Sequence, residues 1–214
     1  GDANESFRNF EQARDLAPNT ERWRLELAGF LSRSGAVAAD DQIALRFYGE
    51  AYNELLEFES RDPYAWATQL QLASATHGIV NRGDDSRVPE LINRYENISS
   101  LMPHFPLTQS NAAEGILAMG AWESAAEVAN KAIAMEALTA PLPKAWWTRG
   151  EAEFQLGRVE DARISFEASV ARSALGPHTE RSHRRLAEIA EMRGDETEAE
   201  IHRDLANHVA RNFA

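Results

Sequence analysis

The sequence contains no cysteine, which excludes disulfide bonds, thiolate zinc sites and a cysteine nucleophile. It also has no apolar run near the roughly 18 residues that a membrane-spanning helix needs. Basic residues are in the minority, with 22 Lys and Arg against 34 Asp and Glu, and the net charge is −12. Because such a charge repels phosphate backbones and anionic membrane surfaces, the composition argues against nucleic-acid binding.

Recognisable catalytic motifs are missing as well. There is no glycine-rich phosphate loop, no serine elbow and no hydroxyl–histidine arrangement. The histidines show neither the i, i+4 spacing nor the carboxylate motif of a zinc-binding helix; they are His77, His104, His178, His183, His202 and His208. We therefore predict a protein that is not an enzyme and has neither a cofactor nor a metal site. Since 43% of its residues are hydrophobic, the chain can form a folded core.

Four glycines recur at one spacing. Successive members of the series are 37 residues apart: Gly83, Gly120, Gly157 and Gly194. An alanine follows each of the last three by five residues, namely Ala125, Ala162 and Ala199. A small residue precedes each of the last three by seven residues, namely Ala113, Gly150 and Ala187. Three columns that agree at one period indicate an internal repeat.

Each repeat is expected to consist of two helices joined at its glycine. After Gly157, for example, apolar residues step by three and four positions, as one buried helical stripe does: Val159, Ala162, Phe166 and Val170. A glycine that ends the first helix can adopt the left-handed conformation that lets the chain reverse. Because no stretch alternates as a strand does, the predicted fold class is all-α.

The N-terminal part departs from the period. Gly35 lies 48 residues before Gly83, and we expect the eleven extra residues in 36–49, as a longer loop or a lengthened second helix. Gly35 is interpreted as the turn of its own pair, with a first helix before it. The opening stretch is interpreted as a second helix that lacks its first partner; its apolar residues before Pro18 are Phe7, Phe10, Ala13 and Leu16.

These assignments give one repeat domain over residues 1–214 with about eleven helices. The unpaired helix is expected at 2–17, and the pairs at about 19–62, 63–104, 106–140, 143–176 and 178–213. A stack of repeats normally begins with a complete capping pair. The unpaired first helix therefore predicts that the chain is a fragment of a longer protein.

The repeats resemble the tetratricopeptide repeat. The best match runs from Ala145 to Ser169, with the family's aromatic and small residues at Trp146, Gly150, Phe154, Gly157, Ala162 and Phe166. The resemblance implies an α-solenoid, a right-handed superhelical stack of helix pairs, in which Gly150 lies against Ala162 and lets two helices approach closely. Two features depart from the family: the period exceeds the usual value of about 34, and Arg149 stands where a leucine-like residue is usual.

A stack of helix pairs presents its first helices on the concave side, where such proteins hold partners. On this face we predict partner-binding residues from three successive repeats: Leu107, Ser110, Glu114 and Leu117; Lys144, Trp147, Glu151 and Phe154; Arg181, Arg184 and Glu188. The resemblance gives the same positions as ligand contacts. They would form an acidic row of three glutamates, an aromatic floor of Trp147 and Phe154, and a basic end of Lys144 and the two arginines.

A basic end beside aromatic rings suits an extended or helical segment that carries carboxylates. We therefore predict a non-catalytic scaffold that binds a protein or peptide segment, or a partner domain, in its concave groove. For each charge, the alternative is a solvated helix face with i, i+4 ion pairs.

Two other functions remain open. Residues 16–28 are similar to the repeat tails that follow the spanning helices of some O-antigen polymerase or ligase-like glycosyltransferases. That likeness implies an appendage on the outer face of a bacterial membrane, tethered to a membrane domain of the same parent chain, whereas a free scaffold would be cytoplasmic. The third reading is a ligand-sensing regulator in which Trp147, Phe154 and His77 line a pocket.

Overall fold

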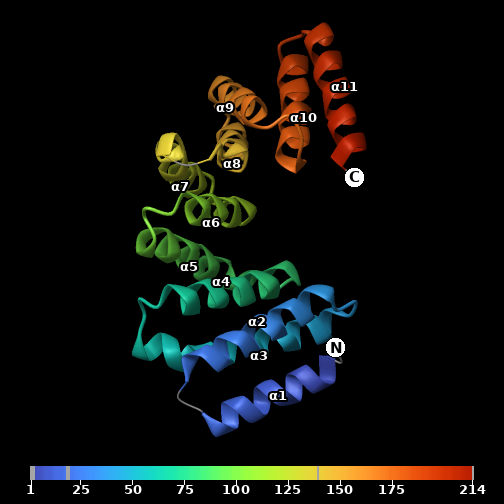
Figure 1. Ribbon diagram of the computed structural model, residues 1–214. Coiled ribbons are helices and arrows are strands. Elements are labelled where there is room, and N and C mark those ends of the chain that lie inside the picture. The colour runs from blue at the N-terminus through green and yellow to red at the C-terminus, as the bar shows by residue number, and fades with distance from the viewer. Residues whose placement is uncertain (1–2, 18–19, 139, 214) are drawn as a thin grey trace. The chain divides into compact units, whose positions relative to one another are not determined.

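The computed structural model describes residues 3–17, 20–138 and 140–213, and all regular elements in those ranges are helical (Figure 1). They comprise eleven α-helices and two short 3-10 helices, so the all-α class and the number of helices are as predicted. None of the described helices is long and apolar enough to cross a membrane. The chain groups into two compact units, Gly1–Leu101 and Met102–Ala214. A single repeat domain and a longer parent protein stay predictions.

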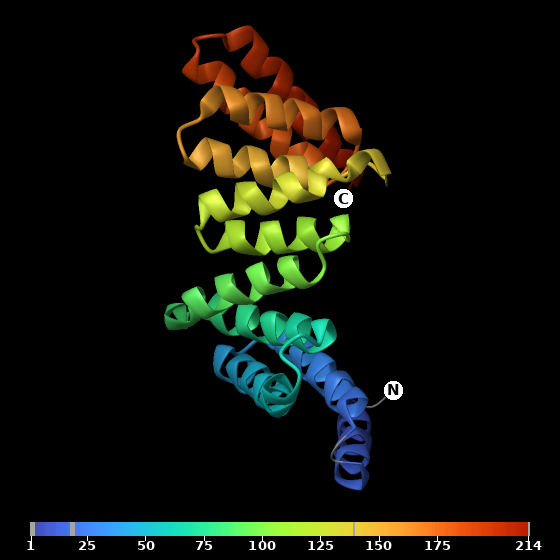
Figure 2. The same cartoon turned by 90° about the vertical axis from the view of Figure 1, so that its left-hand side faces the viewer.

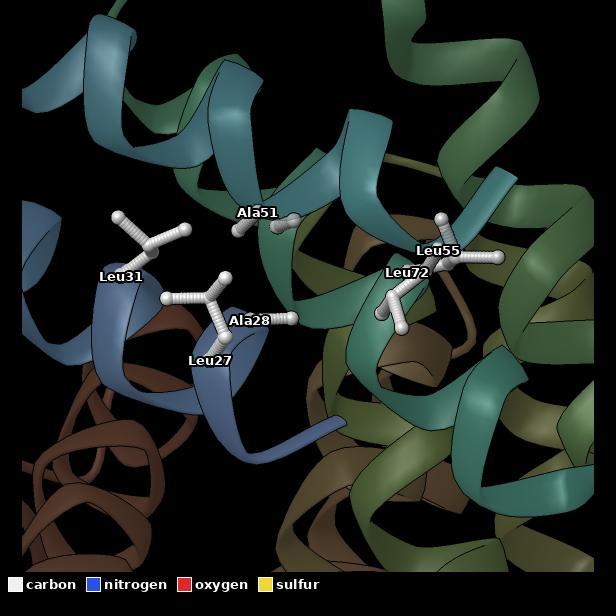
Figure 3. Close-up of a cluster of buried hydrophobic side chains, with 7 residues drawn as sticks. Leu27, Ala28, Leu31, Ala51, Leu55 and Leu72 are labelled. Carbon is white, nitrogen blue, oxygen red and sulfur yellow. The ribbon is translucent and has the colours of Figure 1, made fainter. Parts of the chain in front are cut away.

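The first unit contains α1 to α5 and one 3-10 helix. The elements are α1 (Ala3–Leu16), α2 (Glu21–Val37), α3 (Asp41–Arg61), α4 (Trp66–Asn81), η1 (Asp85–Arg87) and α5 (Val88–Leu101). Helix α2 pairs with α3, α4 packs on both of them, and α5 packs on α4. Figure 3 shows side chains from α2, α3 and α4 that meet in the core, among them Leu27, Leu55 and Leu72. Full burial of each leucine contributes roughly 1.5–3 kcal/mol to folding.

Gly35 is not a turn, which corrects the sequence-based interpretation. It lies buried inside α2, where an added Cβ atom would come within 3.0 Å of the ring of Tyr48. An added Cβ atom at Gly78 of α4 would lie still closer to the same ring. The aromatic ring of α3 therefore needs glycine on both neighbouring helices. Much of the extra sequence lengthens α3, which has 21 residues, as in the second of the two predicted options.

The principal neighbour of helix α1 is α2. The rings of Phe10 and Phe30 lie 5.8 Å apart between these helices. Leu16 is 87% exposed, because a helix with one main neighbour cannot cover its whole apolar face. The side chain of Phe7 and all of Pro18 lie outside the described residues.

The second unit contains three helix pairs. Its elements are α6 (Pro106–Ala118), α7 (Trp122–Ala134), η2 (Glu136–Leu138), α8 (Pro143–Gln155), α9 (Val159–Arg172), α10 (Pro177–Met192) and α11 (Glu196–Phe213). Within each pair, the first helix contacts the second. Successive first helices also contact each other, and α7 and α9 each contact the first helix of the next pair. Figure 2 shows the successive layers of α6, α7, α8 and α9. The first helices α6, α8 and α10 all begin at a proline, which suits the first helical turn.

The periodic glycines occupy equivalent turns. Gly83, Gly120, Gly157 and Gly194 have φ angles of 99°, 77°, 74° and 78°. In each turn, the glycine N–H donates to the carbonyl three residues back, and the next N–H donates to the carbonyl five residues back. These two bonds satisfy carbonyls that the end of the first helix would otherwise leave unpaired. The repeat inferred from the glycine spacing is therefore a repeat of structure.

The small residues allow close helix contacts. Ala125, Ala162 and Ala199 are fully buried, as predicted. An added Cβ atom at Gly150 would lie 2.8 Å from the ring of Phe166, so the absence of a side chain at Gly150 makes room for this ring. The close approach inferred from the sequence is correct, but the residue that requires it is aromatic.

Glu136 fastens the long joint between α7 and α8. Its carboxylate accepts hydrogen bonds from the backbone N–H of Leu142 at 2.7 Å, from Trp146 Nε1 at 3.1 Å and from Arg172 Nε at 2.6 Å. Burial raises the pKa of Glu136, but these hydrogen bonds outweigh burial and hold the pKa below its ordinary value. One carboxylate therefore ties the joint to the first turn of α8 and the end of α9.

We expect Gly157→Ala to lower the free energy of unfolding by about 1–2 kcal/mol. No atom lies within 4 Å of an added Cβ there, so the cost comes from the backbone conformation alone. Urea denaturation followed by circular dichroism measures it. Gly157→Asn is the matched control and should cost less, because asparagine tolerates the left-handed region. Equal stability of Gly157→Ala and the unmodified protein would contradict this role of the turn.

Candidate functional site

All eleven predicted partner-binding residues lie on the first helices of the second unit. Four are on α6, four on α8 and three on α10. Leu107 is 68% exposed, whereas Ser110 and Leu117 are buried at 1% and 5% exposed and offer a partner almost no surface. Phe154 is half-buried and packs against a core cluster formed by Ala162, Phe166, Leu186 and Ile189. The predicted face thus includes exposed residues that a partner could contact and buried residues that belong to the core.

A hollow of about 380 Å³ lies between α8 and α10. Trp147 and Glu151 line it from α8, and Arg181, Arg184, Arg185 and Glu188 line it from α10. Five of these six residues were predicted from the sequence, and Arg185 was not. Phe154 and His77 do not line this hollow, and His77 belongs to the first unit. The predicted ligand-sensing pocket of Trp147, Phe154 and His77 therefore stays a prediction, since only Trp147 lines this hollow.

The acidic row is present, but two of its members are ion-paired to the next first helix. Glu114 of α6 pairs with Lys144 of α8. Glu151 of α8 pairs with Arg185 of α10, which approaches its two oxygens at 2.7 Å and 2.5 Å. Arg185 also donates to Glu188 at 2.5 Å. Glu114 and Glu151 therefore join neighbouring repeats. Since all three glutamates of the row neutralise cations, the row is not a free acidic surface.

Arg185 organises the hollow, although sequence reasoning passed over it. Burial lowers the pKa of its guanidinium, but the hydrogen bonds that it donates to Glu151 and Glu188 outweigh burial and raise the pKa above the usual value. The guanidinium also lies 4.7 Å from the ring centroid of Phe154. The signal available in the sequence was its position 34 residues after Glu151, close to one repeat, which can bring opposite charges on successive first helices together.

Arg181 differs from the other cations of the hollow. It is exposed, and it has no ion pair among the described residues; its guanidinium lies 5.2 Å from the centroid of the Trp147 ring. Arg184, by contrast, pairs with Glu180 one turn earlier on its own helix. The i, i+4 alternative considered for each charge is therefore correct for Arg184 and does not account for Arg181.

Trp147 is partly buried and contacts a neighbouring aromatic ring. Its ring lies 5.3 Å from that of His178 and packs on the core cluster described above. The indole Nε1 is buried and has no hydrogen-bond partner within the described protein. Burial lowers the pKa of His178, and Lys144 and Arg181 lower it further against the opposing effect of Glu114. The imidazole beside Trp147 is therefore neutral at neutral pH.

A second hollow of about 260 Å³ lies next to the first, between α10 and α11. It shares Arg184 and Glu188 with the first hollow and is completed by Ala187, Glu191, Arg203, Ala206 and Asn207. In the described ranges, no group of three or more histidine, aspartate or glutamate side chains is placed to hold a metal ion.

Comparison with solved structures places these helix pairs among known folds. BtubC from P. vanneervenii matches with a TM-score of 0.66 at 18% identity, covering 98% of this chain and 90% of that one. MamA from Desulfovibrio magneticus RS-1 matches with a TM-score of 0.62 at 15% identity, over 88% and 96%. A thermophilic TPR protein from Thermus thermophilus matches with a TM-score of 0.52 at 14% identity, over 80% and 83%.

The chain has a tetratricopeptide-repeat-like fold. At these identities the likeness shows the fold alone. No protein-family model matches the sequence, and comparison with curated proteins also gives no match. The tetratricopeptide-repeat resemblance seen in the sequence is therefore correct for the fold. The likeness of residues 16–28 to O-antigen polymerase or ligase-like proteins is not shown by these comparisons.

We expect Arg185→Gln to lower the free energy of unfolding by about 2 kcal/mol, because it leaves Glu151 partly buried without its cation. The Glu151 side chain is only 12% exposed. Urea denaturation provides the measurement. Arg184→Gln is the control and should cost less than about 0.5 kcal/mol, since its pair is at the surface. Similar losses for the two variants would show that the Glu151–Arg185 pair is no stronger than a surface pair.

Proposed function

We propose that this protein is a non-catalytic interaction module whose second unit binds an acidic segment of a partner protein. The binding site is the hollow lined by Trp147, Glu151, Arg181, Arg184, Arg185 and Glu188. The tetratricopeptide-repeat-like fold agrees with this proposal, because arrays of helix pairs hold partners on the face of their first helices.

The observation that carries the proposal is the free guanidinium of Arg181. An exposed arginine held over an indole ring keeps its planar donor groups available at little entropic cost, since stacking already limits its movement. Guanidinium groups bind carboxylates through two parallel hydrogen bonds. Arg181 therefore supports a partner that brings a carboxylate to the mouth of the hollow.

The local charge balance agrees with an acidic partner although the whole chain is acidic. Three arginines and two glutamates line the hollow, which leaves a local charge of +1 against −12 for the chain. At physiological ionic strength, charges farther away than about 8 Å are largely screened. The hollow's own cations therefore decide which segment binds there, while the remaining negative charge slows approach.

The size of the site suggests a segment and not a small metabolite. The first hollow, of about 380 Å³, is near the lower limit of small-molecule pockets, and five of its six lining residues carry a charge. Because Arg184 and Glu188 also line the second hollow, the surface continues along α10 toward α11. A peptide lying along α10 can use both hollows, with its carboxylates directed toward the arginines.

Calorimetric titration with a hexaglutamate peptide tests the proposal. We expect binding that Arg181→Gln weakens about tenfold, which corresponds to one charge-assisted hydrogen-bond pair of about 1.4 kcal/mol. Arg211→Gln is the control, because it removes the same charge from an exposed position on α11 outside both hollows. A hexalysine peptide should not bind. Equal weakening by the two substitutions, or binding of hexalysine as strong as that of hexaglutamate, would contradict the site.

A further inference from the structure

Two histidines distant in sequence meet where α11 packs on α10. The Nδ1 atoms of His183 and His202 are 3.1 Å apart, and their rings lie 5.3 Å apart at an interplanar angle of 34°. His183 is 6% exposed, and His202 is half-buried. Figure 1 shows α10 and α11 side by side along their length. The two helices of the last hairpin are therefore joined by a hydrogen bond between imidazole rings.

The chemistry of this contact depends on how many protons it holds. A hydrogen bond between two Nδ1 atoms needs one ring to donate and the other to accept, as two neutral imidazoles can do. A first added proton can bind Nε2 of the donating ring and leave the bond intact. A second must bind the accepting Nδ1, which replaces the bond by two facing N–H groups on two cations. Double protonation therefore turns an attractive contact into a repulsive one.

The surroundings oppose protonation of the pair. Burial and, to a lesser extent, the charge of His202 together lower the pKa of His183 to about 4. Burial also lowers the pKa of His202, while Glu198 of α11 and Glu167 of α9 act in the opposite direction. In the part of the chain that the structure describes, no charged group of α8 contributes to either pKa. Both rings are therefore neutral at pH 7.

We propose that His183 and His202 form an acid-sensitive latch that holds the terminal helix α11 on α10 at neutral pH and releases it when both rings are protonated. Release would open the second hollow, because Arg203 and Asn207 line it from α11. It would also remove one support of α10, the helix that carries Arg184 and Glu188. The latch goes beyond the proposed binding function and does not depend on it.

The direction of the pH effect follows from the difference between the closed and released states. A released histidine titrates near its ordinary value of 6.5, whereas His183 in the closed pair titrates at about 4. The latch therefore contributes its full stability above about pH 6.5 and loses it as the pH falls toward 4. For His183 alone, opening becomes roughly 50-fold more favourable between pH 7 and pH 4.5.

Amide hydrogen exchange of the whole chain at pH 7 and pH 4.5, corrected for intrinsic exchange rates, tests the latch. We expect protection of α11 to fall by about 50-fold relative to α8 in the unmodified protein. In His183→Gln, which can hydrogen-bond but cannot become charged, the fall should shrink to less than about fivefold. His208→Gln is the matched control, since His208 is exposed on α11. This variant should show the full fall of about 50-fold in the protection of α11.

Three results would overturn the latch: an unchanged α11 in the unmodified protein, the same fall in His183→Gln as in His208→Gln, or imidazole signals that titrate at ordinary values. The last is read directly by nuclear magnetic resonance on the unmodified protein, so it remains decisive if His183→Gln does not fold. In that case His202→Gln also provides the exchange comparison. Loss of hexaglutamate binding bears on the proposed function and leaves this test unaffected.

Discussion

The left-handed turn at each periodic glycine is the constraint on which the helix pairs depend. A residue with a Cβ atom adopts that conformation only at a cost, whereas glycine adopts it freely and lets two hydrogen bonds close the end of the first helix. The same two hydrogen bonds and a positive φ angle recur at Gly83, Gly120, Gly157 and Gly194, so each first helix ends in the same way. Small residues on the facing sides then bring the helices close enough for Phe166 and similar side chains to fill the interior.

Buried hydrogen bonds fix helix positions that apolar packing alone does not specify. Glu136 holds a joint that is longer than in an ordinary tetratricopeptide repeat, and it does so with bonds to a backbone N–H, an indole and a guanidinium. In the first unit, Arg94 plays a comparable part. It is 7% exposed and reaches Glu59 of α3, Glu90 of α5 and Gln69 of α4. Such buried networks require every partner in place and therefore favour one packing arrangement.

Helix α10 combines two kinds of chemistry on different sides. One side carries Arg181 and Arg185 toward α8, another carries His183 toward α11, and Arg184 lines the hollows on both sides. Arg185 is neutralised by glutamates of its surroundings, so it is structural, whereas Arg181 retains an unused charge above Trp147. The difference between these arginines separates the cations that build the hollow from the one that is available to a partner.

The sequence by itself determined the helix pairs, since glycine spacing, proline positions and three- and four-residue apolar steps are local properties of the chain. It also determined most of the lining of the hollow, because one repeat length carries a residue to the same face of the next first helix. Only the tertiary structure decided that Gly35 accommodates Tyr48 inside a helix, that Glu151 takes Arg185 as its partner, and that His183 meets His202. These contacts join helices through side chains whose distances depend on how the helices pack, and no periodic pattern along the chain records them.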